Sequence, residues 1–321
     1  MAPGGYFGRA LIVDLSTAES SVKTIDEHVL RGFIGGAGLG AWLMHQTCPA
    51  RIDPLAPEAP LIFVFSPLVG TPLTTSAKFA VVAKSPLTGR LTDALASSHF
   101  AIAGKLTGHD AIVIRGRCSE PSILKIDGGT ARLIPAGDLW GQTAADAERR
   151  LRECTGPAWR VAAIGPAGEN EVRYATISHD GRHAGRGGLG AVLGSKLCKA
   201  VMVRATTKVA PADPLGVLDA ARDLRQRSRG RATEKYRELG TMANLLTLNA
   251  ISALPTRNFK SASFEGAEAL SGEQLSELRQ TARNSCASCS IGCEHIYKGR
   301  GDTKVRMEYE NAFALGPLCG V

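Results

Sequence analysis

The chain has 321 residues and a net charge of +8, with 44% hydrophobic and 21% charged residues. This composition is typical of a folded protein and excludes an intrinsically disordered chain. Lysine and arginine are scattered, apart from a denser stretch at 222–237 that we interpret as a solvated helical face, so we expect no nucleic-acid partner. No segment approaches the ~18 apolar residues of a membrane helix and no secretory signal is present, which favours a cytoplasmic protein with no membrane partner.

Short β-branched segments alternate with glycine-rich turns over the first two hundred residues, which predicts strands joined by turns. Strands are predicted at residues 10–15, 61–65, 79–84, 111–115, 122–126, 160–164, 172–178 and 199–203. Helices are predicted at residues 39–46, 99–106, 144–153 and 188–195. Because strands dominate and the helices do not follow them regularly, the pattern favours an α+β fold.

A second region follows the proline-containing segment 209–214, with helices predicted at residues 214–229, 242–251 and 272–283. We therefore expect a first domain over residues 1–207 and a second, mostly α-helical domain over residues 208–321. The sequence ends in an apolar stretch at 312–321, whereas domain ends are usually polar. This predicts that the second domain is truncated.

Three of the eight cysteines, Cys286, Cys289 and Cys293, are clustered in sequence. Cytoplasmic cysteines rarely form a disulfide framework, and thiolates at this spacing favour an iron–sulfur cluster or zinc. A [4Fe–4S] cluster needs four thiolates, so one would come from elsewhere. Zinc would use His295 as its fourth ligand, although a Cys-x-His pair is cramped for a tetrahedral site. The loop is polar and contains Gly292, which disfavours the interpretation of the three cysteines as core residues. The spacing favours iron–sulfur over zinc.

Two glycine-rich segments, at 35–40 and 185–190, resemble nucleotide-binding loops. The second segment satisfies G-x-G-x-x-G, which alone is weak evidence. A dinucleotide loop needs a strand directly before it and an acidic residue about 20 residues later. Residues 179–184 form a polar, basic turn, and residues 205–208 contain no acid. The hypothesis of an NAD site therefore fails in this context.

Basic side chains around the second glycine segment favour a different ligand. Arg182, His183 and Arg186 flank a glycine turn before a predicted helix, an arrangement that suits phosphate. A tight turn with solvated arginines explains the same pattern equally well. The polar stretch at 66–79 could lie under a large polar ligand, with Lys78 as a further phosphate partner.

Together these segments resemble the aldehyde:ferredoxin oxidoreductase family of tungsten and molybdenum bis-pterin enzymes. The matching stretches, in chain order, are GRALIVDLS at 8–16, SPLVGT at 66–71, KSPLTG at 84–89, GHDAIV at 108–113, IGPAGEN at 164–170, AGRGGLGAVLGSK at 184–196, the cysteine segment and EYE at 308–310. The stretches at 164–170 and 184–196 are the most specific.

The resemblance implies a β-rich N-terminal domain of two sheets that forms the base for two pyranopterins. It also implies a tungsten or molybdenum ion held by their four dithiolene sulfurs, Mg²⁺ bridging their phosphates, and a [4Fe–4S] cluster in the cysteine loop. The implied reaction converts a small aldehyde and water to a carboxylic acid. Electrons pass to ferredoxin or to an electron-transfer subunit.

The resemblance also assigns metal and catalytic residues. Cys286, Cys289 and Cys293 match three cluster ligands. Glu310 matches a glutamate near the metal, which implies a role in activating water or moving a proton at the aldehyde carbon. Without the resemblance, Glu310 would be interpreted as an N-terminal helix carboxylate that the helix dipole stabilises.

Pterin contacts follow in the glycine segment. Gly185 and Arg186 match such contacts, and Ala184 with one of His183 or Arg182 matches the neighbouring ones, although this sequence is one residue short there.

Three further positions depart from the family's pattern. Lys78 stands where the family usually has arginine, so the charge remains and the bidentate fork is lost. Leu95 replaces an asparagine and Ser97 a glycine. If the asparagine contributes its backbone carbonyl to Mg²⁺, Leu95 can substitute, whereas a side-chain ligand would be lost.

The family continues for roughly as many residues again, with an Asp-x-x-Gly-Leu-Asp-type pterin motif, the fourth cluster cysteine and a histidine near the metal. None of these is found in this sequence, and Cys319 is not at the place expected for the fourth ligand. We therefore expect a fragment or subunit that needs the missing C-terminal half or a second copy of the chain. The alternatives are a non-catalytic remnant that binds a cofactor or partner and, less favoured, an NAD-linked dehydrogenase with a structural zinc.

Overall fold

The computed structural model describes residues 2–321, with the backbone alone for residues 279–281, and divides into two compact units. Unit 1 contains the chain up to Pro72 together with Ser76–Val217. Unit 2 contains Leu73–Thr75 and Leu218–Val321. The domain boundary that the sequence predicts near residue 207 remains a proposal, distinct from this division into units.

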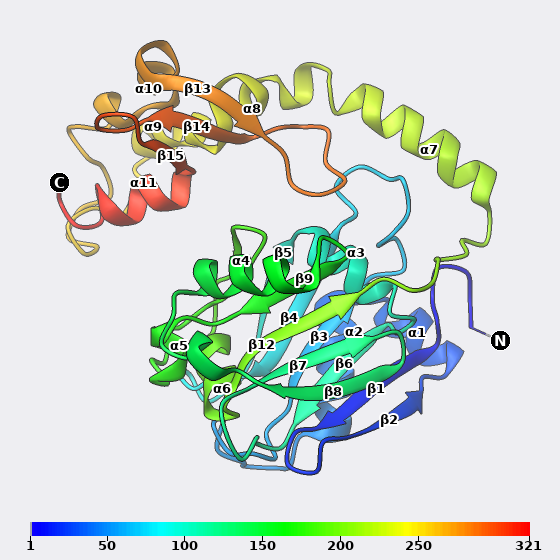
Figure 1. Ribbon diagram of the computed structural model, residues 1–321. Helices are drawn as coiled ribbons and strands as arrows, with labels where there is room; N and C mark the ends of the chain where they lie inside the picture. The colour runs from blue at the N-terminus through cyan, green and yellow to red at the C-terminus, as the bar shows by residue number, and fades with distance from the viewer. Residues whose placement is uncertain (1) are drawn as a thin grey trace. The chain divides into compact units, whose positions relative to one another are not determined.

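The described part of unit 1 contains two six-stranded sheets, and each sheet mixes parallel and antiparallel strand pairs (Figure 1). The first sheet has the order β2-β1-β6-β3-β4-β5, with β1 (Arg9–Asp14), β2 (Glu19–Thr24), β3 (Leu61–Phe65), β4 (Lys78–Lys84), β5 (Leu91–Ser97) and β6 (Ala111–Arg115). The second sheet has the order β11-β10-β9-β12-β7-β8, with β7 (Ser122–Asp127), β8 (Thr130–Pro135), β9 (Trp159–Ala163), β10 (Ile177–His179), β11 (Arg182–Ala184) and β12 (Cys198–Arg204).

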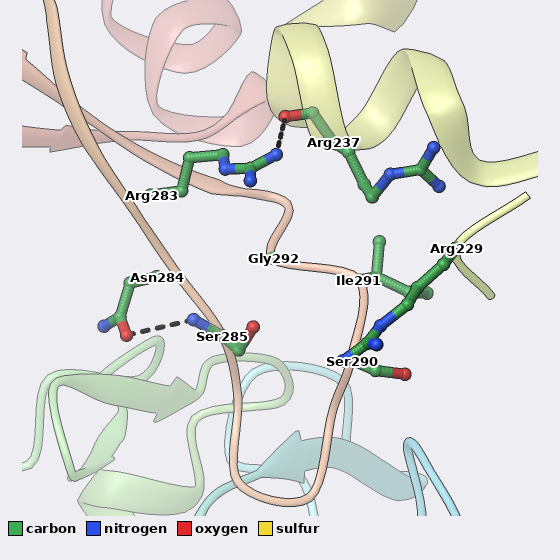
Figure 2. A pocket seen from close by; sticks show the side chains of 8 residues that line it. All are labelled: Arg229, Arg237, Arg283, Asn284, Ser285, Ser290, Ile291 and Gly292. Atoms are coloured by element: carbon green, nitrogen blue, oxygen red, sulfur yellow. Dashed lines mark hydrogen bonds between the residues drawn. The ribbon is translucent and has the colours of Figure 1, made fainter. Parts of the chain in front are cut away.

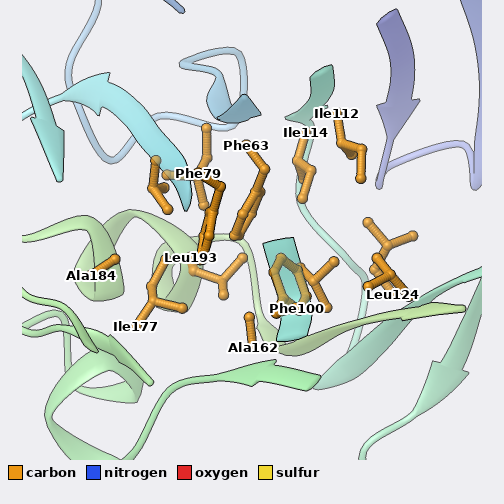
Figure 3. Close-up of a cluster of buried hydrophobic side chains, with 14 of the residues drawn as sticks. Phe63, Phe79, Phe100, Ile112, Ile114, Leu124, Ala162, Ile177, Ala184 and Leu193 are labelled. Carbon is orange, nitrogen blue, oxygen red and sulfur yellow. The ribbon is translucent and has the colours of Figure 1, made fainter. Parts of the chain in front are cut away.

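The main core lies between the two sheets and is rich in aromatic rings (Figure 3). Phe63 on β3 lies 6.1 Å from Phe79 on β4, and Phe79 lies 5.3 Å from Phe100, measured between ring centroids. The intervening β3 residues Ile62 and Val64 belong to a second core on the other face of the sheet. Since β3 is buried on both faces, its sequence is a continuous apolar run and not an alternating one.

Helices cover the outer faces of both sheets and also fill the space between them. The helices of unit 1 are α1 (Glu27–Phe33), α2 (Gly36–Thr47), α3 (His99–Lys105), η1 (Gly137–Leu139), α4 (Ala144–Thr155), α5 (Pro166–Glu169) and α6 (Leu189–Ser195). Leu43 of α2 packs on the outer face of the first sheet and Leu151 of α4 on that of the second. Phe100 of α3 and Leu193 of α6 pack between the sheets.

Unit 2 combines short helices with a small antiparallel sheet of order β13-β14-β15. Its elements in chain order are α7 (Pro214–Arg227), which begins in unit 1, η2 (Arg231–Thr233), α8 (Glu234–Leu239), η3 (Gly240–Asn244), α9 (Leu245–Ala250), η4 (Glu268–Leu270), α10 (Gly272–Arg279), β13 (Gln280–Asn284), β14 (Glu294–Lys298), β15 (Lys304–Met307) and α11 (Tyr309–Leu315). A core that includes Met242, Leu245 and Phe264 holds them together. Over residues 2–321, no helix has the length and apolar character of a membrane span.

The α+β class with two sheets in the N-terminal part is confirmed, and the predicted strands at 61–65 and 111–115 coincide with β3 and β6. The predicted helix at 272–283 is wrong beyond Arg279, because the following residues pair with β14 as strand β13. The predicted strand at 172–178 is confirmed only at its end. Before β10 the chain turns, with the N–H of Ala175 donating to the carbonyl of Val172 at 2.8 Å.

A buried ion pair joins the N-terminal segment to the first sheet. Lys105 and Asp110 pair with each other, and both side chains are fully buried. The Asp110 carboxylate also accepts the backbone N–H groups of Phe7 and of Gly8, the latter at 2.7 Å. Burial lowers the pKa of Lys105, and the charge of Asp110 counteracts this effect.

We predict that Asp110→Ala lowers the free energy of unfolding by about 3–5 kcal/mol, because it leaves a buried ammonium and the backbone N–H groups of Phe7, Gly8 and Arg9 without their acceptor. Urea denaturation measures this change. The matched control Glu27→Ala removes the exposed pair between Glu27 and Arg31 and should cost less than about 1 kcal/mol. Equal losses in the two variants would contradict a structural role for the buried pair.

Candidate functional site

A pocket of about 450 Å³ lies in unit 1 between strand β5 and the loop after β11. It is lined by residues 91–95 together with Gly185 and Arg186. Strands β5 and β11 are edge strands of the two sheets and contact each other. The pocket therefore lies where the edges of the two sheets meet.

Glycines hold the loop after β11 close to its neighbours. Gly187 has a φ of +80°, and a Cβ there would lie 2.4 Å from the hydroxyl oxygen of Thr92. Gly188 has a φ of +73°, and a Cβ there would lie 2.0 Å from the carbonyl oxygen of Arg173. Both positions require glycine. At Gly185, by contrast, a Cβ would meet no atom within 4 Å, so the loop leaves open space on the pocket side.

The side chains of the pocket combine charge with exposed apolar area. Arg186 is exposed, and no partner of its guanidinium is found among residues 2–321. Asp93 is also exposed, and Leu91 and Leu95 are 55% and 61% exposed. The guanidinium suits an anionic group, the exposed leucines suit apolar ligand surface, and the carboxylate suits a hydrogen-bond donor or a cation.

Strand alternation explains which residues of β5 share this face. Residues 91, 93, 95 and 97 point to one side of the strand, and Ala94 and Ala96 are buried on the other. Lys78 pairs directly with Ser97 across β4 and β5, so it belongs to the same face. The Ser97 hydroxyl donates to the carbonyl of Ala77 at 3.0 Å. The structure thus aligns Lys78, Leu95 and Ser97 on one face, although only Leu95 lines the pocket.

Arg182, His183 and Ala184 form β11 and do not line the pocket. Ala184 is fully buried in the core between the sheets, so only its backbone is available to a ligand. The Nδ1 of His183 hydrogen-bonds with the hydroxyl of Ser178 at 2.9 Å, and burial followed by the charge of Arg182 lowers the pKa of this histidine. Gly185 and Arg186 are therefore the residues of this segment that the structure brings to the pocket.

Asp93 and Thr92 are pocket residues that sequence reasoning missed. Strand β5 was not predicted, because its sequence LTDALAS lacks a β-branched run. The signal that could have indicated Asp93 was Leu95, the position where the family has an asparagine. A residue two positions earlier on the same strand shares the face of Leu95.

Buried polar contacts anchor the β10–β11 hairpin that supports the loop. Asp180 lies in its turn with a φ of 49°, and its N–H donates to the Glu148 carboxylate at 3.1 Å. Its carboxylate accepts the N–H of Phe100 at 3.3 Å and lies 3.9 Å from the guanidinium groups of Arg152 and Arg160. Burial, followed by the charge of Asp180, raises the pKa of Glu148.

His179 is fully buried beside this turn. Its Nδ1 hydrogen-bonds with the hydroxyl of Ser98 at 2.9 Å, and its ring packs edge-on against Phe79 with 4.9 Å between centroids. Its Nε2 has no hydrogen-bond partner within the described part of the chain. Burial lowers the pKa of His179 to about 4, so the ring is neutral near pH 7.

In unit 2, the three clustered cysteines lie on the loop between β13 and β14, and each is half-buried. The N–H of Cys289 donates to the carbonyl of Cys286 at 3.1 Å, which closes a turn between the first two cysteines. Gly292 precedes Cys293 with a φ of 70°, a left-handed conformation that glycine adopts without strain. The cysteines form no disulfide within residues 2–321.

Hydroxyl contacts hold the cysteine loop at Ser290. The N–H of Ser290 donates to the hydroxyl oxygen of Thr74 at 3.0 Å. The Ser290 hydroxyl lies 2.8 Å from that of Thr74 and 2.6 Å from that of Ser228. The backbone between the second and third cysteines is therefore held from two sides.

His295, the proposed fourth zinc ligand, is fully buried on β14. Its Nε2 donates to the carbonyl of Arg237 at 3.2 Å, and burial lowers its pKa. Across residues 2–321, no group of three or more His, Cys, Asp or Glu side chains is arranged to hold one metal ion. A [4Fe–4S] cluster takes one thiolate per iron, so the donor set of three thiols on one loop fits such a cluster when a fourth ligand is supplied.

Glu310 is exposed in the first turn of α11. Glu308 caps the helix through a capping box with Asn311. A carboxylate in the first turn is stabilised by the helix dipole, which is the structural interpretation of Glu310. Its catalytic role stays a proposal.

Comparison with known proteins gives matches along nearly the whole chain. Residues 10–205 match the family described as aldehyde ferredoxin oxidoreductase, N-terminal domain, and residues 219–321 match aldehyde ferredoxin oxidoreductase, domains 2 & 3. The tungsten-containing aldehyde ferredoxin oxidoreductases of Pyrococcus horikoshii and Thermococcus kodakarensis are 35% and 36% identical over 99% of this chain and 53% of their own length. The chain thus spans about half the length of these relatives.

A solved structure is also similar. The active site complex BamBC of benzoyl coenzyme A reductase, in complex with 1,5 dienoyl-CoA, superposes with a TM-score of 0.82 at 26% identity. The similarity covers 98% of this chain and 51% of that chain. An aliphatic sulfonate oxidoreductase, WOR-like subunit, from Pyrococcus furiosus is 32% identical over 62% of this chain and 34% of that protein. Similar chains therefore belong to proteins named for different substrates.

We predict that His179 makes stability depend on pH. Its pKa of about 4 lies below the value near 6.5 of an unfolded histidine, so the unfolded state binds the proton first as pH falls. Stability is then lost from about pH 6.5 down to about pH 4, by up to about 3 kcal/mol in total.

Urea denaturation of His179→Gln at several pH values tests this dependence. The variant should show a smaller loss between pH 6.5 and pH 4 than the parent chain, whatever its stability at pH 7. His28→Gln, which changes an exposed histidine of α1, serves as the control and should retain the parent's pH dependence. An unaltered pH dependence in His179→Gln would refute the assignment.

Proposed function

Because this chain belongs to the aldehyde ferredoxin oxidoreductase family, we propose that it supplies the pterin-binding base and three cluster cysteines of an enzyme that oxidises an aldehyde to a carboxylic acid. The pocket that unites Leu95, Gly185 and Arg186 is the observation that best supports this function. These residues come from the edges of two sheets and coincide with positions assigned from sequence. A tungsten or molybdenum bis-pyranopterin supplies, when bound, the two-electron oxidation of the aldehyde.

The chain's own residues have distinct proposed roles in holding the cofactor. Gly185 would leave room for the pterin, and the Arg186 guanidinium would donate hydrogen bonds to its phosphate. Lys78 adds a point charge on the same strand face. The Asp93 carboxylate and the backbone carbonyl of Leu95 would be oxygen ligands suited to a Mg²⁺ ion bound with the cofactor.

Unit 2 has the proposed roles in electron and proton transfer. Cys286, Cys289 and Cys293 would supply three thiolates to a [4Fe–4S] cluster, which would serve electron transfer to ferredoxin or an electron-transfer subunit. Glu310 accepts or returns a proton at the aldehyde carbon. The fourth thiolate comes from the remaining half of the enzyme or from a partner chain, in keeping with the chain spanning about half of its relatives.

We predict that Arg186→Gln lowers the pterin content of anaerobically purified protein by about tenfold or more. A charge-assisted hydrogen bond is worth about 1.5–3 kcal/mol, and about 1.4 kcal/mol corresponds to a factor of ten. Fluorescence of the extracted, oxidised pterin measures the content. Arg173→Gln, which removes a nearby exposed charge outside the pocket, should retain the parent's content. Equal pterin content in both variants would count against the proposed pocket.

A further inference from the structure

A second recess, of about 670 Å³, lies in unit 2 beside the cysteine loop (Figure 2). Its polar lining comes from Arg229, Arg237, Arg283, Asn284, Ser285 and Ser290. Among the described lining residues, none is acidic and none is a cysteine. The recess therefore presents three positive charges beside the loop that carries the cysteines.

Arg237 is held in place at this recess. Its Nη1 donates to the carbonyl of Gly230 at 2.9 Å and to the hydroxyl oxygen of Thr233 at 2.7 Å. Its backbone carbonyl accepts a hydrogen bond from Nη1 of Arg283 at 3.0 Å, as Figure 2 shows. A guanidinium held this way loses little further freedom when it binds a ligand.

The other two arginines place their charges around the same space. Arg229 is exposed and follows α7, whereas Arg283 lies on β13. The acidic residue opposite Asn284 in the sheet, Glu294, pairs with Arg306 at 3.2 Å and does not line the recess. Three like charges around one space repel one another, and a multiply charged anion would offset that repulsion.

We propose that this recess binds a small oxyanion with two or more negative charges, a phosphate ester or a polycarboxylate. Guanidinium forks match the oxygen geometry of both groups, and the amide of Asn284 with the hydroxyl of Ser285 adds neutral donors. The site goes beyond the proposed oxidoreductase function and does not depend on it. Because Ser285 directly precedes Cys286 and Ser290 directly follows Cys289, a bound anion restrains the cysteine loop.

Isothermal titration calorimetry of the 321-residue chain tests the proposal, with pyrophosphate and citrate as separate probes at about 0.15 M salt. Arg229→Gln and Arg283→Gln should each weaken binding of the preferred anion by about tenfold or more. Arg231→Gln is the matched control, because it removes an exposed charge two residues from Arg229 and outside the recess. Arg237 is left intact because its side chain also holds the backbone.

Tighter binding of pyrophosphate supports a phosphate ester, and tighter binding of citrate supports a polycarboxylate. Two results overturn the proposal: heat too small to detect with either anion at millimolar concentration, or a loss in Arg231→Gln equal to that in the recess variants. Circular dichroism confirms that each variant is folded. Since no pterin or iron is needed for this assay, its failure leaves the proposed function standing, and loss of pterin binding leaves this site standing.

Discussion

The close approach of the glycine loop to strand β5 is the constraint on which the candidate site depends. Thr92 lies against Gly187, so a side chain at this glycine would move the loop away from the strand. The carbonyl of Arg173 lies against Gly188, so a side chain there would move the loop away from the segment before β10. That approach places Arg186 beside the exposed face of β5 and forms the pocket. The two sheets are kept at this separation by the aromatic core between them, to which Phe79 contributes from the neighbouring strand.

The support of the loop is as important as the loop itself. His179 and Asp180 anchor the hairpin turn. His179 does so through its hydrogen bond with Ser98 and its aromatic packing, and Asp180 through its contacts with Glu148 and with the start of α3. A charged cofactor needs donors whose positions are already set before binding, because ordering them afterwards costs free energy. Rigid strand edges, with glycines only at the point of closest approach, meet that need.

Part of the fold could be predicted because some strands, such as β3, are buried on both faces and form a continuous apolar run. The glycine loop and the cysteine triad were equally visible, since their chemistry is local in sequence. Strand β5 could not be predicted, because its conformation depends on pairing with β4 and is not indicated by its own residues. Asp93, which lies on this strand, was missed for the same reason. The arginine recess was missed since Arg237 and Arg283 meet only through tertiary structure, and the stretch at 222–237 had been interpreted as a solvated face.

Elemental analysis of the anaerobically purified chain, with Cys289→Ser beside it, tests the central claim most directly. We expect tungsten or molybdenum together with iron in the parent chain. In Cys289→Ser we expect that iron is lost while tungsten or molybdenum is retained, because the thiolates and the pterin pocket belong to different units. Zinc without iron, tungsten or molybdenum in the parent chain would contradict that claim.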